Sequence, residues 1–477
     1  MKRFLLIVPP TGKYIREDRC QTPIEKLKTV ALRPPIDLMY AAAGLESGGA
    51  ECRLVDFPAE NRSWADFRKI LQEFSPDALL ISITTPSLER DLEAAALARE
   101  IIPDIFTIAK GAHFNTLDVK TLEEHPELDA VLRGEYEITC RELAEGRKPE
   151  EIKGMTFRNG EGKIRQNPSR PFCDDLDQLP FPARHLVKNE LYLRPDTGKP
   201  QTTIVTNRGC PFSCIFCLAN QVAGRKNRVR SHENILAEIE ECIQRYNIRN
   251  FLFRSDLFTA SRKWVMDLCD EIIRRDLDIT WACNSRVDTI DGEILRKLKA
   301  AGCWLIAFGV ESGDQEILDR MNKKLKLDEV RKALELTRRS GILSSIYFLF
   351  GLPWDSPRVF ETDLSFAKEL DPDFLEIFYV YPFPGTRLYE IAVKAGLLQE
   401  GEIPQSAYDA PAMGTLHLSK GELSEWRRRF LRRFYLRPRY ILHTMKNIRT
   451  PRVFSNYVKY GIAQLIDLIL PSSRGEE

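Results

Sequence analysis

The chain has 477 residues, more than one ordinary domain needs, so two or three domains are expected. Hydrophobic residues make up 43% and charged residues 29%, and the net charge of +1 excludes a chain-wide basic surface for nucleic acid. No apolar run reaches the roughly 18 residues of a membrane span, and the start, MKRFLLIVPPTG, predicts a core strand instead of a signal peptide.

Residues 1–158 alternate short apolar runs with amphipathic stretches. This alternation predicts an α/β domain with a doubly wound parallel sheet of Rossmann or flavodoxin type. Such a sheet binds ligands at the carboxyl ends of its strands. The expected strands are Arg3–Val8, Glu51–Asp56, Asp77–Ile83, Ile105–Ala109 and Ala130–Leu132, and the expected helices are Pro35–Glu46, Trp64–Phe74, Ser87–Ile102, Leu117–His125 and Glu135–Glu145.

Residues 159–200 are rich in proline and are expected to form a linker or wrapping segment. From residue 201 to 396 the alternation resumes six times, which predicts a partial (β/α)6 barrel with its chemistry at the C-terminal mouth. The expected strands are Thr202–Asn207, Arg249–Phe253, Ile279–Cys283, Cys303–Phe308, Ser345–Phe350 and Leu375–Tyr379, and the expected helices are His232–Tyr246, Arg262–Arg274, Gly292–Ala301, Leu327–Ser340, Pro357–Leu370 and Arg387–Ala395.

Three of the eleven cysteines fall within eight residues, in the stretch RGCPFSCIFC. Thiolates select zinc or iron–sulfur clusters, but structural zinc is normally closed by four protein ligands and the chain has no second CxxC. Cys210, Cys214 and Cys217 therefore predict a 4Fe-4S cluster with one open iron, with zinc or unligated core thiols as the alternatives. The scattered cysteines are expected to pack as free thiols in a reducing, cytoplasmic compartment.

With this triplet, the stretch Thr202–Ala395 resembles the radical S-adenosylmethionine (SAM) superfamily. The resemblance continues at the ends of the later expected strands, where that family places SAM contacts: RSD, NSR, GVESG, GLP and YPFPGT. Each charged residue there could instead cap a helix or form an ordinary ion pair. The residues that the resemblance assigns to SAM are Phe216, Asp256, Arg286, Glu311, Gly351 and Pro384.

The region Arg3–Glu145 resembles the N-terminal domain of cobalamin-binding radical SAM enzymes, through RPP, Asp56, TTPS, KGAHF and RGEYE in that order. The DxHxxG signature, whose histidine ligates cobalt, is absent, so His113 is expected near the corrin or its tail without ligating the metal. A dinucleotide site is less favoured because no GxGxxG follows the first strand. The residues assigned to cobalamin are Thr11, Pro35, Asp56, Ser82, Thr84, Thr85, Gly111, His113, Gly134 and Glu135.

Residues 397–477 are expected to be helical, basic and aromatic, with eleven Lys or Arg and no Asp or Glu between Trp426 and Gln464. One interpretation is a segment that packs on the edge of the barrel. The other is peripheral contact of residues 426–470 with anionic lipid. Nucleic acid is less favoured, because the stretch YVKYGIAQLIDLIL is amphipathic and rich in Ile and Leu.

The resemblance implies that the reduced cluster cleaves SAM to a 5′-deoxyadenosyl radical, which attacks an unactivated carbon of a small molecule. It implies either methyl transfer or rearrangement and ring formation, on a lipid-like, tetrapyrrole or other substrate, with an external electron donor of flavodoxin or ferredoxin type. An RNA-modifying methylthiotransferase, a non-catalytic cobalamin carrier and a lipid-bound structural protein are the alternatives. The first should carry a second cysteine set in the N-terminal domain, and Cys20, Cys52 and Cys140 do not resemble one.

Overall fold

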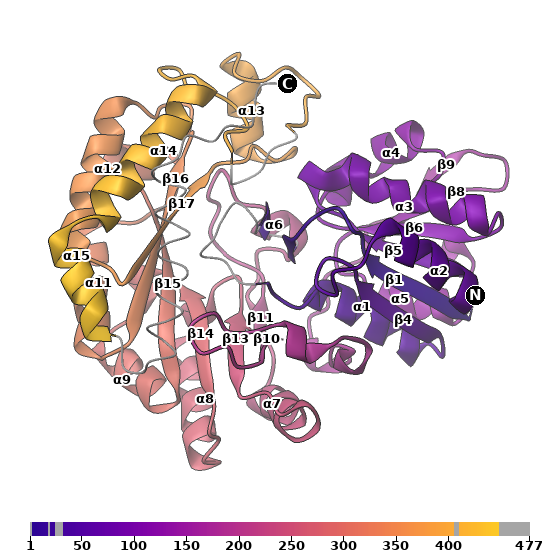
Figure 1. Cartoon of the computed structure of the whole chain (residues 1–477), viewed down its shortest axis with the longest axis horizontal. Coiled ribbons are helices and arrows are strands. Elements are labelled where there is room, and N and C mark those ends of the chain that lie inside the picture. Colours follow the sequence, from indigo (N-terminus) through magenta and orange to yellow (C-terminus); the bar gives the residue numbers. More distant parts are fainter. Residues whose placement is uncertain (1, 18–19, 24–31, 405–409, 448–477) are drawn as a thin grey trace.

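Two sheets, one in each half of the chain, organise the structure (Figure 1). The computed structural model describes residues 2–17, 20–23, 32–404 and 410–447. Each sheet carries its own helices. The predicted fold class, a doubly wound sheet followed by a partial barrel and a helical C-terminal segment, is confirmed.

The first sheet has the strand order β4-β1-β5-β6-β7-β8-β9, and its first five strands in this order are parallel. Helices α1 and α5 cover one face, while α2, α3 and α4 cover the other, so the parallel strands are apolar on both sides. The bounds are β1 Arg3–Val8, α1 Ile36–Ser47, β4 Glu51–Asp56, α2 Trp64–Phe74, β5 Ala78–Ser82, α3 Leu88–Ile101, β6 Phe106–Lys110, α4 Phe114–Glu124, β7 Ala130–Leu132, α5 Glu137–Ala144, β8 Met155–Arg158 and β9 Ile164–Gln166.

Two antiparallel hairpins were not predicted. One is the β2–β3 hairpin (Tyr14–Glu17 and Cys20–Pro23), inserted between β1 and α1. The other is β8–β9, which extends the first sheet beyond residue 158, so the expected linker begins with a strand of that sheet. Their strands have three or four residues each, too few for an alternating apolar pattern to show.

The second sheet has six parallel strands in sequence order, β10-β13-β14-β15-β16-β17, with β10 and β17 at the ends of this order. Alternate residues of these strands pack against the surrounding helices in one large core. The sheet therefore forms the predicted open barrel. The bounds are β10 Gln201–Val205, α7 His232–Tyr246, β13 Asn250–Arg254, α8 Arg262–Arg274, β14 Thr280–Ser285, α9 Gly292–Ala300, β15 Cys303–Glu311, α10 Gln315–Arg320, α11 Leu327–Arg339, β16 Leu343–Phe350, α12 Pro357–Leu370, β17 Phe374–Tyr379 and α13 Arg387–Lys394.

The C-terminal helix α14 (Lys420–Tyr435) packs on the barrel beside α12 (Figure 1). Phe430 lies against Phe348 and Phe350, with ring centroids 5.9 and 5.4 Å apart, and Phe434 is also buried. This part of the basic segment is thus a structural edge of the barrel. Helix α15 (Pro438–Asn447) follows, and residues 448–470 of the predicted lipid-contacting stretch lie outside the described residues.

None of the described helices combines the length and the hydropathy that a membrane span requires.

Candidate functional site

Residues 209–227, called the cysteine loop below, connect two short antiparallel strands, β11 (Asn207–Arg208) and β12 (Arg228–Val229). Gly209 has φ +94°, and a Cβ at this position would lie 2.0 Å from the carbonyl oxygen of Lys226. The Gly209 amide donates to the carboxylate of Asp256, which follows β13. Only glycine fits this turn, and Asp256 holds it against the end of the second barrel strand.

A Gly209→Ala substitution is therefore expected to prevent the loop from closing, with at least a severalfold loss of iron per protein after anaerobic reconstitution. The physical reason is a backbone clash that no side-chain movement relieves, added to the cost of a positive φ for alanine. Gly421→Ala is the control, because a Cβ there meets nothing within 4 Å. Equal iron content in the two variants would show that this turn does not limit cluster loading.

The rest of the loop is tied to the barrel through its backbone. The Ile215 amide donates to the carbonyl of Met321 at 3.1 Å, and the Ile215 carbonyl accepts from Leu388 at 3.0 Å. Asn322 Nδ2 donates to the carbonyl of Ser213 at 2.9 Å. The segment after α10 and the start of α13 thus position the middle of the cysteine loop.

Three charged side chains come together beside Cys214. Lys323 Nζ lies 2.7 Å from the carboxylate of Glu311, and both side chains are buried. The guanidinium of Arg286 donates to the carbonyls of Lys323 and Lys324 at 3.1 Å and lies 3.7 Å from the ring centroid of Phe212 in the cysteine loop. Burial raises the pKa of the Cys214 thiol, while the nearby charge of Lys323 acts in the opposite direction.

Three residues assigned to SAM are thus placed around the loop: Asp256, Arg286 and Glu311. Phe216 lies within the loop itself, with the Lys323 ammonium 5.9 Å from its ring centroid. Lys323 was not among the site residues predicted from the sequence. A lysine twelve positions after a predicted glutamate carries no local signal, and only the turn after β15 brings the two together.

The last two residues assigned to SAM lie at the ends of β16 and beyond β17. The Gly351 amide donates at 2.9 Å to Asp355, a buried carboxylate whose pKa is raised mainly by burial. The carbonyl of Pro384 accepts from the Thr116 hydroxyl of α4 at 3.4 Å, so this loop touches the first domain. Gln221, from the short helix α6 (Ala219–Val222), donates to the neighbouring carbonyl of Gly385.

No set of three His, Cys, Asp or Glu side chains in the described part of the chain surrounds the position of a single metal ion. The three cysteines of the loop are half-buried. Three thiols on one loop, with backbone bonds that hold that loop on the barrel, have the donor chemistry that an iron–sulfur cluster needs.

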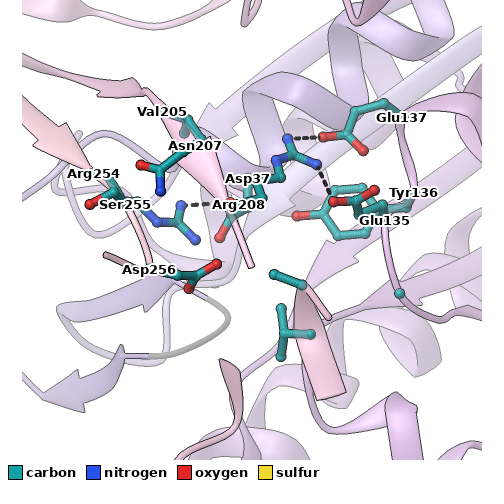
Figure 2. A pocket seen from close by; sticks show the side chains of 13 residues that line it. Asp37, Glu135, Tyr136, Glu137, Val205, Asn207, Arg208, Arg254, Ser255 and Asp256 are labelled. Atoms are coloured by element: carbon teal, nitrogen blue, oxygen red, sulfur yellow. Dashed lines mark hydrogen bonds and ion pairs between the residues drawn. The ribbon is translucent and has the colours of Figure 1, made fainter. Parts of the chain in front are cut away.

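A pocket with about 510 Å³ of space, part of it open to solvent, lies between the two domains (Figure 2). The ends of β10 and β13 line one side, and α1, the β7–α5 loop and the start of α5 line the other. Its lining residues are Asp37, Gly134, Glu135, Tyr136, Glu137, Val205, Asn207, Arg208, Val222, Ala223, Arg254, Ser255 and Asp256.

Ion pairs join the domains across this pocket. Arg208, two residues before the first cysteine of the loop, pairs with both Glu135 and Glu137 (Figure 2). Arg254 at the end of β13 lies 2.7 Å from Asp37 of α1. Although burial opposes ionisation of Glu135, the charges of Arg208 and Arg228 hold its pKa below the ordinary value.

Most residues assigned to cobalamin lie at the carboxyl edge of the first sheet. Thr11, Ser82, Thr84 and Thr85 follow or end β1 and β5, and the last three are buried. Gly111 follows β6 and packs closely against the backbone of Ile83, which follows β5. A Cβ at Gly111 would lie 2.6 Å from the carbonyl oxygen of Ile83. Pro35 precedes α1, and Gly134 and Glu135 line the pocket between the domains.

His113 is buried against these hydroxyls. Its Nδ1 lies 3.4 Å from Thr85 Oγ1 and its Nε2 lies 3.2 Å from Thr121 Oγ1. Burial lowers the pKa of His113 to about 4, so the ring is neutral at physiological pH. Both ring nitrogens therefore have a hydroxyl partner.

Asp56, at the end of β4, accepts hydrogen bonds from the Tyr192 hydroxyl at 2.9 Å and from the Ala59 amide at 3.1 Å. Its burial raises the pKa to about 6 from 3.8. Tyr192 belongs to the segment between the domains, so this carboxyl group fastens that segment to the first sheet.

An Asp56→Asn variant is expected to remove a pH dependence of stability. The folded state binds this proton more tightly than the unfolded state, so wild-type stability falls as the pH rises from about 4 through about 6. The shift corresponds to about 3 kcal/mol. Thermal unfolding of the apo protein at about pH 4.5 and about pH 7.5 measures the difference, with Asp104→Asn at an exposed carboxylate as the control. The same pH slope in wild type and Asp56→Asn would contradict the assignment.

Comparison with known sequences gives two family matches. A profile of the Radical SAM superfamily matches residues 204–367, and a profile of the B12 binding domain matches residues 28–144. The chain is 30% identical over 444 residues to the uncharacterized methyltransferase PH0819 of Pyrococcus horikoshii, which covers 92% of this chain and 94% of that protein.

Two further relatives have named reactions. The anaerobic magnesium-protoporphyrin IX monomethyl ester cyclase of Rubrivivax gelatinosus is 27% identical over 419 residues, covering 84% of this chain and 75% of the cyclase. The hopanoid C-3 methylase of Methylococcus capsulatus is 30% identical over 374 residues, covering 76% of this chain and 70% of the methylase.

Two solved structures share the overall fold. OxsB, a cobalamin-dependent S-adenosylmethionine radical enzyme, superposes with a TM-score of 0.73 and 17% identity, covering 98% of this chain and 72% of OxsB. The radical S-adenosylmethionine methyltransferase TsrM of Kitasatospora setae superposes with a TM-score of 0.66 and 19% identity, covering 99% of this chain and 90% of TsrM.

Proposed function

This chain belongs to the cobalamin-dependent radical SAM enzymes, and from that premise we propose that it methylates an unactivated carbon of a small molecule held between its two domains. The pocket between the domains is the observation that carries the proposal. It joins the strand ends beside the cysteine loop to the β7–α5 loop of the B12-binding domain, so a carbon placed there would be within reach of both halves.

A 4Fe-4S cluster, SAM and cobalamin are the cofactors of this family. Cys210, Cys214 and Cys217 would hold the cluster, which when bound supplies the electron that cleaves SAM. Asp256, which anchors the loop through Gly209, would accept from the SAM amine. The buried Lys323–Glu311 pair would orient the Glu311 carboxylate toward the ribose hydroxyls. Arg286, whose guanidinium is paired with Asp288, would contribute positive charge near the SAM carboxylate.

Methyl transfer is the primary proposal because the relative of 30% identity over nearly the whole chain is named a methyltransferase, and another is named a methylase of a hopanoid. Ring formation is the second candidate. The cyclase that acts on magnesium-protoporphyrin IX monomethyl ester is similar over 84% of this chain. We therefore propose a lipid-like or tetrapyrrole substrate.

The proposed function also requires two partners. An external one-electron donor of flavodoxin or ferredoxin type would reduce the cluster. An anionic membrane surface would deliver a lipid-like substrate, and the exposed apolar side chains Ile441, Leu442 and Met445 of α15, with Arg439 beside them, support such a contact.

The test is anaerobic incubation of the reconstituted protein with reductant, SAM and hydroxocobalamin, followed by quantification of 5′-deoxyadenosine and S-adenosylhomocysteine. Methyl transfer consumes a second SAM and leaves S-adenosylhomocysteine, so both products are expected with candidate hopanoid or tetrapyrrole substrates. Ring formation would yield 5′-deoxyadenosine alone. Absence of 5′-deoxyadenosine from protein with full iron and cobalamin content would refute both.

A further inference from the structure

The carboxyl group of Asp363, on α12, holds the loop that follows β15. It accepts from the Ser312 hydroxyl at 2.7 Å and from the Gly313 amide at 2.5 Å, and both Asp363 and Ser312 are buried. Gly313 lies so close to α12 that a Cβ there would be 2.6 Å from the Cβ of Phe366. The loop is therefore fastened to α12 by two hydrogen bonds and by a close approach of the backbone.

The residue just before this contact, Glu311, has a strained backbone. Its φ is +71°, in the left-handed region that residues with a Cβ rarely adopt, and the pairing of β15 with β16 is irregular between Gly309 and Glu311. Such a conformation persists only where the surrounding structure holds it. Lys323 holds the Glu311 side chain, and Asp363 holds the two residues that follow Glu311.

A second carboxyl group, that of Asp355, holds the loop that follows β16. It accepts from the amides of Gly351 and Leu352 at 2.9 and 3.0 Å, and it is buried. The backbone carbonyl of Asp355 accepts from the Thr415 hydroxyl at 3.0 Å, so the segment before α14 fixes this turn as well. Asp355 directly precedes Ser356, the N-cap of α12. Helix α12 and its start therefore supply buried acceptors to the loops of two neighbouring strands.

Both carboxyl groups can act as acceptors without a charge. Burial raises the pKa of Asp363 to about 7 from 3.8, and burial, together with the charge of Asp363, raises the pKa of Asp355 well above its ordinary value. A neutral carboxyl group still accepts hydrogen bonds through its carbonyl oxygen. An apolar replacement would instead leave the buried donors of the loops without an acceptor, which is costly.

We propose that Asp363 and Asp355 are positioning residues for SAM, which keep Glu311 and Gly351 in place at the ends of β15 and β16. The inference rests on the proposed function in that these two loops face SAM. Neither carboxyl group touches the cosubstrate in this scheme. Their oxygens fix the backbone of the two loops, and the loop after β15 in turn fixes the Glu311 carboxylate.

Two substitutions at Asp363 separate the hydrogen bonds from the charge. Asp363→Asn keeps an acceptor oxygen in a side chain of the same shape and removes the charge, whereas Asp363→Leu removes both. Asp373→Leu is the matched control, because Asp373 accepts from the amide and the hydroxyl of Ser344 at 2.9 and 3.2 Å, at the opposite end of β16 from Gly351. Equilibrium dialysis measures SAM binding to the anaerobically reconstituted, unreduced protein, and absorbance titration measures hydroxocobalamin binding.

Asp363→Leu is expected to weaken SAM binding by roughly tenfold or more, because Glu311 is no longer held in its strained conformation. Asp363→Asn should bind SAM within about threefold of wild type, since the two hydrogen bonds remain. Iron content and hydroxocobalamin affinity should stay at the wild-type level in both variants. Asp373→Leu should lower the unfolding temperature and leave SAM binding unchanged.

Three results would overturn the inference. Wild-type SAM affinity in a folded Asp363→Leu protein would show that the contact does not position the loop. An equal loss in Asp363→Asn would assign the effect to the charge, and an equal loss in Asp373→Leu would assign it to general destabilisation. Wild-type protein with full iron content that fails to bind SAM would instead overturn SAM as the cosubstrate.

Ser312→Ala provides a second variant in case Asp363→Leu does not fold. It removes the hydroxyl that donates to Asp363 and accepts from the Asp314 amide, and it leaves the hydrogen bond from Gly313 to Asp363 in place. A severalfold loss of SAM affinity is expected, without loss of iron or of hydroxocobalamin affinity. SAM binding equal to wild type in this variant would contradict the positioning role of Asp363.

Discussion

Replacing Cys214 with alanine is expected to lower the rate of 5′-deoxyadenosine formation by at least about a thousandfold, which corresponds to about 4 kcal/mol of activation free energy. Three thiolates already leave one iron of a cubane without a protein ligand, and removing one of them leaves two. The loop offers no replacement, because the neighbouring residues Ser213 and Ile215 supply no thiol. The measurement is product formation per protein, together with the iron and sulfide content of the anaerobically reconstituted variant.

Cys283→Ala is the matched control for this experiment. Cys283 lies in β14, is buried in the barrel core and faces the helices instead of the cysteine loop. Its replacement removes a buried thiol without touching the proposed ligands, so iron content and product formation should stay close to wild type. Wild-type turnover by Cys214→Ala would eliminate the cluster assignment of this loop.

The second large effect is expected for Lys323→Met. The Lys323 ammonium and the Glu311 carboxylate are buried 2.7 Å apart, and although burial opposes the charge on Lys323, Glu311 raises its pKa. Removing the ammonium leaves the carboxylate buried without its partner, which costs about 3–5 kcal/mol in comparable buried pairs. Glu311 also has φ +71°, so a strained backbone depends on this contact.

Thermal unfolding and equilibrium binding of SAM to the cluster-loaded protein measure the two consequences separately. Lys324→Met is the control, because that neighbouring lysine is exposed and its side chain makes no contact with Glu311. We expect Lys323→Met to lose stability and to weaken SAM binding, and Lys324→Met to change neither by much. Normal SAM binding by a destabilised Lys323→Met protein would show that Glu311 does not contribute to the SAM site.

Much of the fold could be predicted because its signals are local. Apolar runs alternating with amphipathic stretches predicted both parallel sheets, and helices such as Trp64–Phe74 and Pro357–Leu370 have the bounds that were expected from this alternation. The short β2–β3 and β8–β9 hairpins were not predicted, because strands of three or four residues have too few positions for the alternation of apolar and polar residues to show.

The sequence alone determined the order of the two sheets and predicted the chemistry of the cysteine loop, because three thiols within eight residues and a repeating strand–helix pattern need no knowledge of distant contacts. Only the tertiary structure decided which charges meet. Arg208 pairs with Glu137 across 71 positions and Arg16 with Asp91 across 75, and no periodicity links them. Such pairs form because the tertiary fold brings together loops and helices that are distant in sequence, and there burial makes each charge depend on a partner that lies far away in the chain.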